Sequence, residues 1–388
     1  MATQDFNGTP EISPLQLARA LEAGDPLQVL DVRAPDRVAA GRIDLVPANR
    51  FHNIVGSQLL TFQSLKGTGI DSRLPVTVVC GHGHDSWTVA AHLNRLGYRA
   101  TSLSGGVAAW MSLVLARELE PPPPLDRLIQ FDRVGKGALG YLLVSAGQAL
   151  IVDPPRDAEA YLLAAHDAGA EVVGVADTHV HADYISGASS LARILGVPYY
   201  LHAADSAYPY DGTPGSLEFR SLEDGDTIRV GRLALRASHT PGHTEGSLTY
   251  LIGTAAALTG DFIFIRSVGR PDLAGKASAW TAQLWESLQA VRRDWPPETI
   301  IYPAHYSSEN ERRSDRSVGA PLRQLFEENA AFRIPERDAF AQWVEDAMAP
   351  VPAAYRRIKA VNVGLASVDE QEAEELEVGR NECALEER

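Results

Sequence analysis

Three polar side chains at alternate positions, His179, His181 and Asp183, constrain the fold of this chain more than any other feature. They follow a valine-rich run, residues 172–175, that predicts a buried strand, and they precede a glycine- and serine-rich helix start. A loop that leaves a strand need not alternate faces, so these side chains can converge on one point. Because imidazoles and carboxylates grouped in this way usually bind metal, we expect a metal ion there.

Three further motifs supply partners for this loop. His243 lies within Pro-Gly-His-Thr, Asp261 within Thr-Gly-Asp, and His305 within Pro-Ala-His. Each motif ends an apolar run beside glycine or proline, so each places one ligand on the same rim of two packed sheets. Polar residues that merely cap a helix, the alternative reading of the first loop, would not need these partners.

In this order the four motifs resemble the metallo-β-lactamase fold, nearest to its glyoxalase II and persulfide dioxygenase branch. The resemblance covers roughly Leu125 to Val351 and implies a four-layer αββα sandwich. Short alternating strands separated by glycine turns within residues 227–261 agree with such a fold.

By this resemblance, His179, His243 and Asp261 hold one Fe²⁺ ion, and Zn²⁺ is the alternative because the same ligands accept either metal. Two histidines and one carboxylate leave three octahedral positions open for a sulfur substrate and dioxygen. The other polar residues of the motifs then either hydrogen-bond these ligands or fill a second metal position: His181, Asp183 and His305.

Two residues distinguish this chain from the zinc hydrolases of the fold. Tyr184 stands where those enzymes have a histidine ligand, and neutral tyrosine is a poor ligand for zinc. We expect Tyr184 to donate a hydrogen bond to a bound oxygen species or to serve in packing. Arg270 follows the Gly-Asp strand in Gly-Arg-Pro-Asp, a pattern that resembles the persulfide dioxygenases. It would either bind a carboxylate of a glutathione-like thiol or pair with Asp272.

The first third of the chain predicts a separate domain. Strand patterns at residues 26–33, 75–79 and 98–103 alternate with helical patterns, as in a small parallel-sheet α/β domain. Cys80 follows the second of these strands, where a glycine-rich loop enters a helix. Backbone N–H groups and the positive end of the helix dipole stabilise a thiolate at such a position.

Asp31–Arg33, the loop Cys80–Asp85 and Gly105–Trp110 together resemble a rhodanese domain over roughly Glu11 to Ala116, which implies that Cys80 is catalytic and carries a persulfide sulfur. Asp85 occupies the place of a usual arginine, and its carboxylate repels an incoming dianion such as thiosulfate. Three readings of this loop stay open: a working sulfur carrier, a docking module without activity, and a Cys/His metal site.

These resemblances divide the chain into four parts. A rhodanese-like domain at 1–117 precedes a proline-rich linker at 118–125, whose four consecutive prolines favour a stiff extended segment. A metallo-β-lactamase-fold domain at 126–365 and an acidic tail at 366–388 follow. The tail is rich in acids and poor in aromatic residues, so we expect it to be solvated and frayed, with Cys383 incidental.

Charge and cysteine content exclude several partners. The net charge of -15 argues against nucleic acid, and no apolar run is long enough to span a membrane. Two cysteines can form at most one disulfide bond, too few to stabilise a chain of 388 residues. This indicates a reducing, cytoplasmic setting. A homo-oligomer is compatible with the sequence.

Together the two domains predict an enzyme that uses dioxygen to oxidise a low-molecular-weight, glutathione-like persulfide to sulfite and thiol. Cys80 would exchange sulfur with the same pool, since tethering raises local concentration. One alternative is a zinc-dependent thioester or lactone hydrolase, in which His179, His181 and His243 hold zinc and Asp183 orients the attacking water. The other is a sulfur-binding sensor or scaffold without catalytic activity.

Overall fold

A computed structural model describes residues 9–385 and divides the chain into two compact units. The first comprises the residues up to Leu113 with the short segments Arg133–Lys136 and Val378–Arg380. The second comprises Val114–Asp132, Gly137–Glu377 and the residues from Asn381 onward. Within residues 9–385, no helix has the length and apolar character required to cross a membrane.

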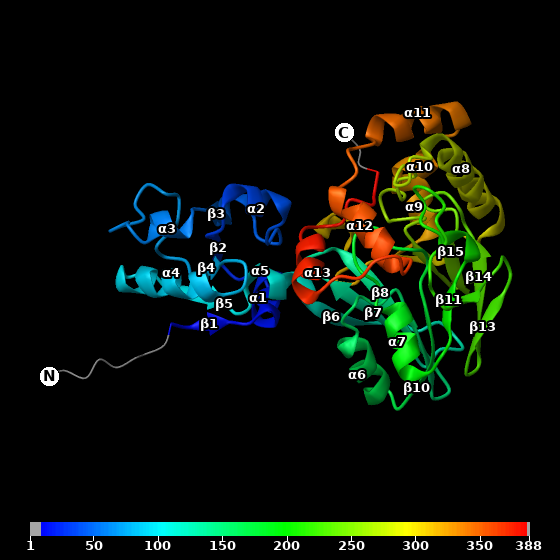
Figure 1. Cartoon of the computed structure of the whole chain (residues 1–388), viewed down its shortest axis with the longest axis horizontal. Helices are drawn as coiled ribbons and strands as arrows, with labels where there is room; N and C mark the ends of the chain where they lie inside the picture. The colour runs from blue at the N-terminus through cyan, green and yellow to red at the C-terminus, as the bar shows by residue number, and fades with distance from the viewer. Residues whose placement is uncertain (1–8, 386–388) are drawn as a thin grey trace. The chain divides into compact units, whose positions relative to one another are not determined.

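The first unit is built on a five-stranded sheet whose strands all run parallel in the order β1-β5-β4-β2-β3 (Figure 1). The buried valines of the central strand β4 form its core together with side chains of α4. The predicted parallel-sheet α/β domain is therefore confirmed. Its elements are β1 (Glu11–Ile12), α1 (Pro14–Glu22), β2 (Gln28–Asp31), α2 (Pro35–Ala40), β3 (Phe51–Asn53), α3 (Gly56–Leu59), β4 (Val76–Val79), α4 (His84–Arg95), β5 (Ala100–Leu103) and α5 (Gly106–Ser112).

The second unit contains two sheets. A seven-stranded sheet has the order β12-β11-β10-β9-β8-β7-β6, and a six-stranded sheet has the order β13-β14-β15-β16-β17-β18. The strands are β6 (Val114–Leu119), β7 (Arg127–Arg133), β8 (Ala138–Ser145), β9 (Gln148–Val152), β10 (Glu171–Ala176), β11 (Tyr199–Leu201), β12 (Arg220–Ser221), β13 (Thr227–Val230), β14 (Leu233–His239), β15 (Leu248–Ile252), β16 (Ala256–Gly260), β17 (Ile300–Pro303) and β18 (Ala320–Pro321).

Strand β8 shows why these sheets form a sandwich. Tyr141 and Leu143 belong to the core shared with the six-stranded sheet, whereas Leu142 and Val144 pack against the helices on the other face. Successive side chains of a strand point to opposite faces, so a strand that is apolar at every position must be covered on both sides. The predicted αββα arrangement is confirmed.

Helices cover the outer face of each sheet (Figure 1). On the seven-stranded sheet these are α6 and α7; on the six-stranded sheet, α8 presents Leu284 and Leu288, four residues apart, and packs against α11. Lys276 is the N-cap residue of α8 and makes no side-chain cap hydrogen bond. The helices are α6 (Glu159–Asp167), α7 (Ala188–Leu195), α8 (Ala277–Asp294), α9 (Leu322–Glu328), α10 (Ala330–Arg333), α11 (Arg337–Ala347), α12 (Ala353–Asn362) and α13 (Glu370–Leu376).

Two boundaries differ from those that the sequence suggests. Residues 114–117, placed by sequence in the first domain, form part of β6 at the edge of the seven-stranded sheet. The tail is not frayed over its described part, because it forms α13. The N-cap residue of this helix, Asp369, accepts a hydrogen bond from the backbone N–H of Glu372 at 2.8 Å. Cys383 and Leu385 are buried, so a few apolar side chains anchor a segment whose acids mostly face solvent.

Candidate metal centre

The predicted ligands lie where strands of the second unit end. His179, His181 and Asp183 follow β10, and His243 lies between β14 and β15. Asp261 directly follows β16, and the parallel neighbour β17 leads to His305. Strand ends from both sheets therefore bring these side chains to one rim of the sandwich, as the motif order predicts.

His179, His243 and Asp261 form what we term the first donor group. Their ligand atoms lie within 4.8 Å of one another, and each residue is at most 1% exposed. Asp261 Oδ2 lies 3.6 Å from His179 Nε2 and 3.4 Å from His243 Nε2. None of these three atoms has a hydrogen-bond partner within residues 9–385. Buried polar atoms rarely lack partners, so their convergence fits a metal ion.

The backbone of the Gly-Arg-Pro-Asp motif orients His243. Its Nδ1–H donates to the carbonyl oxygen of Arg270 at 2.9 Å, which leaves Nε2 as the free donor atom. A Cβ atom at Gly269 would lie 1.9 Å from the carbonyl oxygen of Asp261 and 2.8 Å from His243 Nδ1. Only glycine permits this close approach.

Thr178 orients His179 in the same way. His179 Nδ1 lies 3.0 Å from Thr178 Oγ1, and that hydroxyl donates to Asp153 Oδ2 at 2.9 Å. Burial holds the pKa of His179 well below its usual value and lowers the pKa of His243 to about 4. Both imidazoles are therefore neutral near pH 7, the form in which histidine binds metal.

His181 is not brought into the first donor group. Its Nε2 lies 3.1 Å from Asp153 Oδ1 and 2.9 Å from the hydroxyl of Tyr184, and its third neighbour is Asp177 at 3.9 Å. The Tyr184 hydroxyl also donates to the backbone oxygen of Asp153 at 3.3 Å. Burial holds the pKa of Tyr184 well above its usual value, so its phenol is neutral and connects the loop to β9.

Asp183, His305 and Cys383 form a second donor group, also with ligand atoms within 4.8 Å of one another. His305 Nδ1 donates to Asp261 Oδ1 at 2.6 Å, and His305 Nε2 lies 3.1 Å from Asp183 Oδ2. Burial lowers the pKa of His305, but the negative charges of Asp183 and Asp261 exceed that effect and raise it to about 10. Asp261 thus presents one oxygen to each donor group. Sequence reasoning missed Cys383.

Arg270 has a structural partner. Its guanidinium donates to both oxygens of Asp272 at 2.7 Å and also reaches the carbonyl oxygens of Ala349 and Glu382. The side chain is 2% exposed, so these acceptors account for it without a substrate carboxylate. Of the two roles expected for Arg270, the geometry favours pairing with Asp272.

Other buried polar residues that sequence reasoning missed hold the ligand loops. Asp205 accepts hydrogen bonds from the backbone N–H of Val180 at 2.9 Å and from Thr244 Oγ1 at 2.8 Å, so it joins the loops of His179 and His243. From α12, Lys359 donates to the carbonyl oxygen of Val180 at 2.8 Å. No spacing rule links these residues to the motifs; only the fold brings them together.

Cys80 lies in the first unit, at the end of β4. Its Sγ accepts a hydrogen bond from the backbone N–H of Gly83 at 3.1 Å and lies 3.3 Å from Ser86 Oγ. Helix α4 begins at His84, so the irregular loop is shorter than the predicted Cys80–Asp85. The backbone N–H expected to face the sulfur is present, and the Asp85 side chain is exposed.

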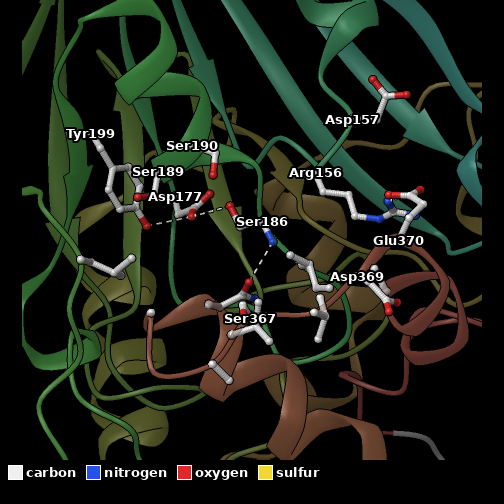
Figure 2. A pocket seen from close by; sticks show the side chains of 18 residues that line it. Arg156, Asp157, Asp177, Ser186, Ser189, Ser190, Tyr199, Ser367, Asp369 and Glu370 are labelled. Atoms are coloured by element: carbon white, nitrogen blue, oxygen red, sulfur yellow. Dashed lines mark hydrogen bonds and ion pairs between the residues drawn. The ribbon is translucent and has the colours of Figure 1, made fainter.

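Two pockets lie beside the ligand loops. The larger, about 680 Å³, contains Asp177, which accepts hydrogen bonds from Ser186 and Tyr199 (Figure 2). None of the three residues of the first donor group lines it. The smaller, about 130 Å³, is lined by residues of the two histidine loops and of the helices that cover them: Val180, Thr244, Lys276, Trp280 and Lys359.

A different family model matches each of the two units. Residues 135–305 match the metallo-beta-lactamase superfamily, and residues 13–113 match the rhodanese-like domain. Each match falls within the region over which the sequence motifs resemble the corresponding fold.

Individual relatives fall into different reaction classes. The chain is 32% identical over 217 residues to the human mitochondrial persulfide dioxygenase ETHE1. That match covers 54% of this chain and 74% of the human protein. It is 38% identical over 173 residues to a hydroxyacylglutathione hydrolase of Acidiphilium cryptum. That match covers 44% of this chain and 66% of the hydrolase. A solved metallo-beta-lactamase of Staphylococcus aureus superposes with a TM-score of 0.55 at 26% identity, over 63% of this chain and 74% of that one.

Proposed function

The chain belongs to the metallo-β-lactamase superfamily and carries a rhodanese-like domain ahead of that fold, and from this premise we propose that it oxidises a glutathione-like persulfide to sulfite and thiol at one iron ion. The observation that carries the proposal is the first donor group. Two neutral imidazoles and one carboxylate with unsatisfied, converging atoms form the ligand set typical of mononuclear iron oxygenases. The human relative is itself named a persulfide dioxygenase.

The proposed reaction consumes one persulfide, one dioxygen and one water, and gives one thiol, one sulfite and two protons. The terminal sulfur gives up the four electrons that reduce dioxygen, and the bond between the two sulfur atoms breaks. Ferrous iron, when bound, supplies the one-electron chemistry that lets dioxygen react with a sulfur ligand.

The chain's own residues prepare this site. Thr178 and the carbonyl oxygen of Arg270 each hold a proton on Nδ1 of a histidine, so both Nε2 atoms stay available. The 130 Å³ pocket against the histidine loops suits a small substrate. Its lining is of mixed charge, because Asp205 and Glu245 accompany Lys276 and Lys359.

We assign Cys80 the transfer of sulfur to or from the same persulfide pool. The N–H of Gly83 and the start of α4 face its sulfur, an arrangement that stabilises the negative charge of a thiolate. Because Cys80 and the donor group belong to one chain, an intermediate released by one reaction is generated near the other.

Metal analysis combined with turnover tests the proposal. Protein expressed without added metal should contain iron, consume oxygen when given glutathione persulfide in air, and release sulfite in proportion. Cys80→Ser, which leaves the donor group intact, should keep this oxygen uptake and lose sulfur transfer. Iron-loaded protein that consumes no oxygen with the persulfide would overturn the proposal.

A second candidate, a zinc-dependent thioester hydrolase, is favoured by one observation. The second donor group lies across Asp261 from the first, and a carboxylate shared between two groups suits a pair of metal ions. The Acidiphilium relative is named a hydrolase. Zinc in the purified protein, with thioester cleavage and no oxygen uptake, would favour this function.

A further inference from the structure

We infer that Cys383 is a metal ligand and that, with Asp183 and His305, it forms a second metal position beside the first donor group. The three side chains come from the loop after β10, the loop after β17 and the segment after α13. Their ligand atoms lie within 4.8 Å of one another, and each residue is at most 1% exposed. This inference goes beyond the proposed oxidation and holds whichever reaction the first donor group supports.

The chain fixes Cys383 in place through its backbone. The carbonyl oxygen of Cys383 accepts a hydrogen bond from the N–H of Arg270 at 2.8 Å, and the N–H of Leu385 donates to Val268 at 3.0 Å. Ala384 forms an antiparallel bridge with Gly269. These contacts attach the segment to the loop that follows Asp261, and therefore the thiol is held at the centre rather than on a mobile end.

Cys383 has both apolar and polar neighbours. It packs in a cluster with Phe264 and Leu273, as a buried cysteine commonly does. In addition, ligand atoms of Asp183 and His305 lie within 4.8 Å of its sulfur, and Tyr355 OH is 4.0 Å away. His305 Nε2 makes no hydrogen bond of suitable geometry within residues 9–385, although Asp183 lies 3.1 Å away.

Charge also favours a cation at this position. Asp183 and Asp261 are both fully buried, and His305 is the residue that faces both of them. Burying carboxylates is costly unless positive charge compensates them, and a divalent cation supplies that charge. One thiolate, one imidazole and one carboxylate form a ligand set suited to zinc, or to cobalt as its spectroscopic substitute.

The neighbouring tyrosine does not complete this group. The hydroxyl of Tyr184 is engaged by His181 and by the backbone of Asp153, so it adds no donor beside Asp183. Cys383, which lies far downstream in the sequence, supplies the third donor instead.

Cobalt titration of the full-length metal-free protein tests the inference, because a thiolate ligand gives an intense charge-transfer absorption in the near ultraviolet. Wild type and Cys80→Ser should both show this band and bind a second equivalent of cobalt. Cys383→Ser should lose both the band and the second equivalent, while it keeps the visible bands of cobalt in the first donor group. Cys80 is the only other cysteine, so Cys80→Ser is the matched control.

Two results would overturn the inference. One is a wild-type protein that fills its first donor group and shows no thiolate band; the other is a band that persists in Cys383→Ser. If Cys383→Ser does not fold by circular dichroism, Asp183→Asn serves as the second variant, since it keeps the thiol and the side-chain shape. Asp183→Asn should weaken binding of the second equivalent; unchanged binding would equally contradict the inference.

Discussion

His179 and His181 belong to one loop and are both buried, yet the Nε2 atoms of the two rings have different surroundings. Nε2 of His179 has no hydrogen-bond partner within residues 9–385 and points at His243 and Asp261. Nε2 of His181 instead faces Asp153 and the Tyr184 hydroxyl. The comparison shows that spacing brings both histidines to one rim of the sandwich. Asp153 then engages Nε2 of His181, and only Nδ1 of that ring has no hydrogen-bond partner within residues 9–385.

The largest expected effect separates the two histidines directly. His179→Ala removes a donor from a three-donor group, so the purified protein should contain iron only at background level and consume no oxygen with glutathione persulfide. The matched His181→Ala should keep iron, because His181 groups with Asp153 and Asp177 rather than with the first donor group, although its Nδ1 has no hydrogen-bond partner within residues 9–385. Elemental analysis of both proteins checks this prediction, and equal loss of iron from the two variants would make His181 a ligand.

A smaller effect is expected from Thr178, which contacts the ligand His179 but is not itself in the first donor group. Thr178→Val removes the hydroxyl that fixes the ring of His179, and the affinity for metal should fall roughly 10-fold, as is usual when a residue that supports a ligand is lost. Competition with a chelator of known affinity measures this change. Thr178→Ser keeps the hydroxyl and should bind metal as the wild type does; unchanged affinity in Thr178→Val would show that Thr178 does not orient His179.

The smallest effect concerns the His181 side of the comparison. Tyr184→Phe removes a buried hydroxyl that contacts His181 and Asp153, and the free energy of unfolding should fall by about 1 kcal/mol. Iron content should not change, because the hydroxyl lies outside the first donor group. Urea denaturation and elemental analysis provide the two measurements. Loss of iron without loss of stability would assign Tyr184 to the metal site instead.

Much of the architecture could be predicted from the sequence, because patterns of neighbouring residues determine where the strands form. The valine-rich run of β10 and the alternation of β13 to β15 depend on neighbouring residues, and each predicted strand is present. The first donor group was also predictable, since His179, His243 and Asp261 each end a strand of the same sandwich.

The remainder depends on contacts between distant residues. Asp153 and Asp205 hold the histidine loops, but nothing in their own sequence surroundings marks them as partners of those loops. The acidic composition of the tail concealed Cys383 and Leu385, because an average over many charged residues hides a few buried ones. For Arg270 the sequence left two roles open, and the position of Asp272 favours one of them.

The attachment of Cys383 to the loop after Asp261 has a consequence for the order in which the protein is made. Synthesis runs from the N-terminus, so all residues of the first donor group emerge from the ribosome well before Cys383 does. A nascent chain can therefore acquire its first metal ion while the neighbouring position still lacks its sulfur.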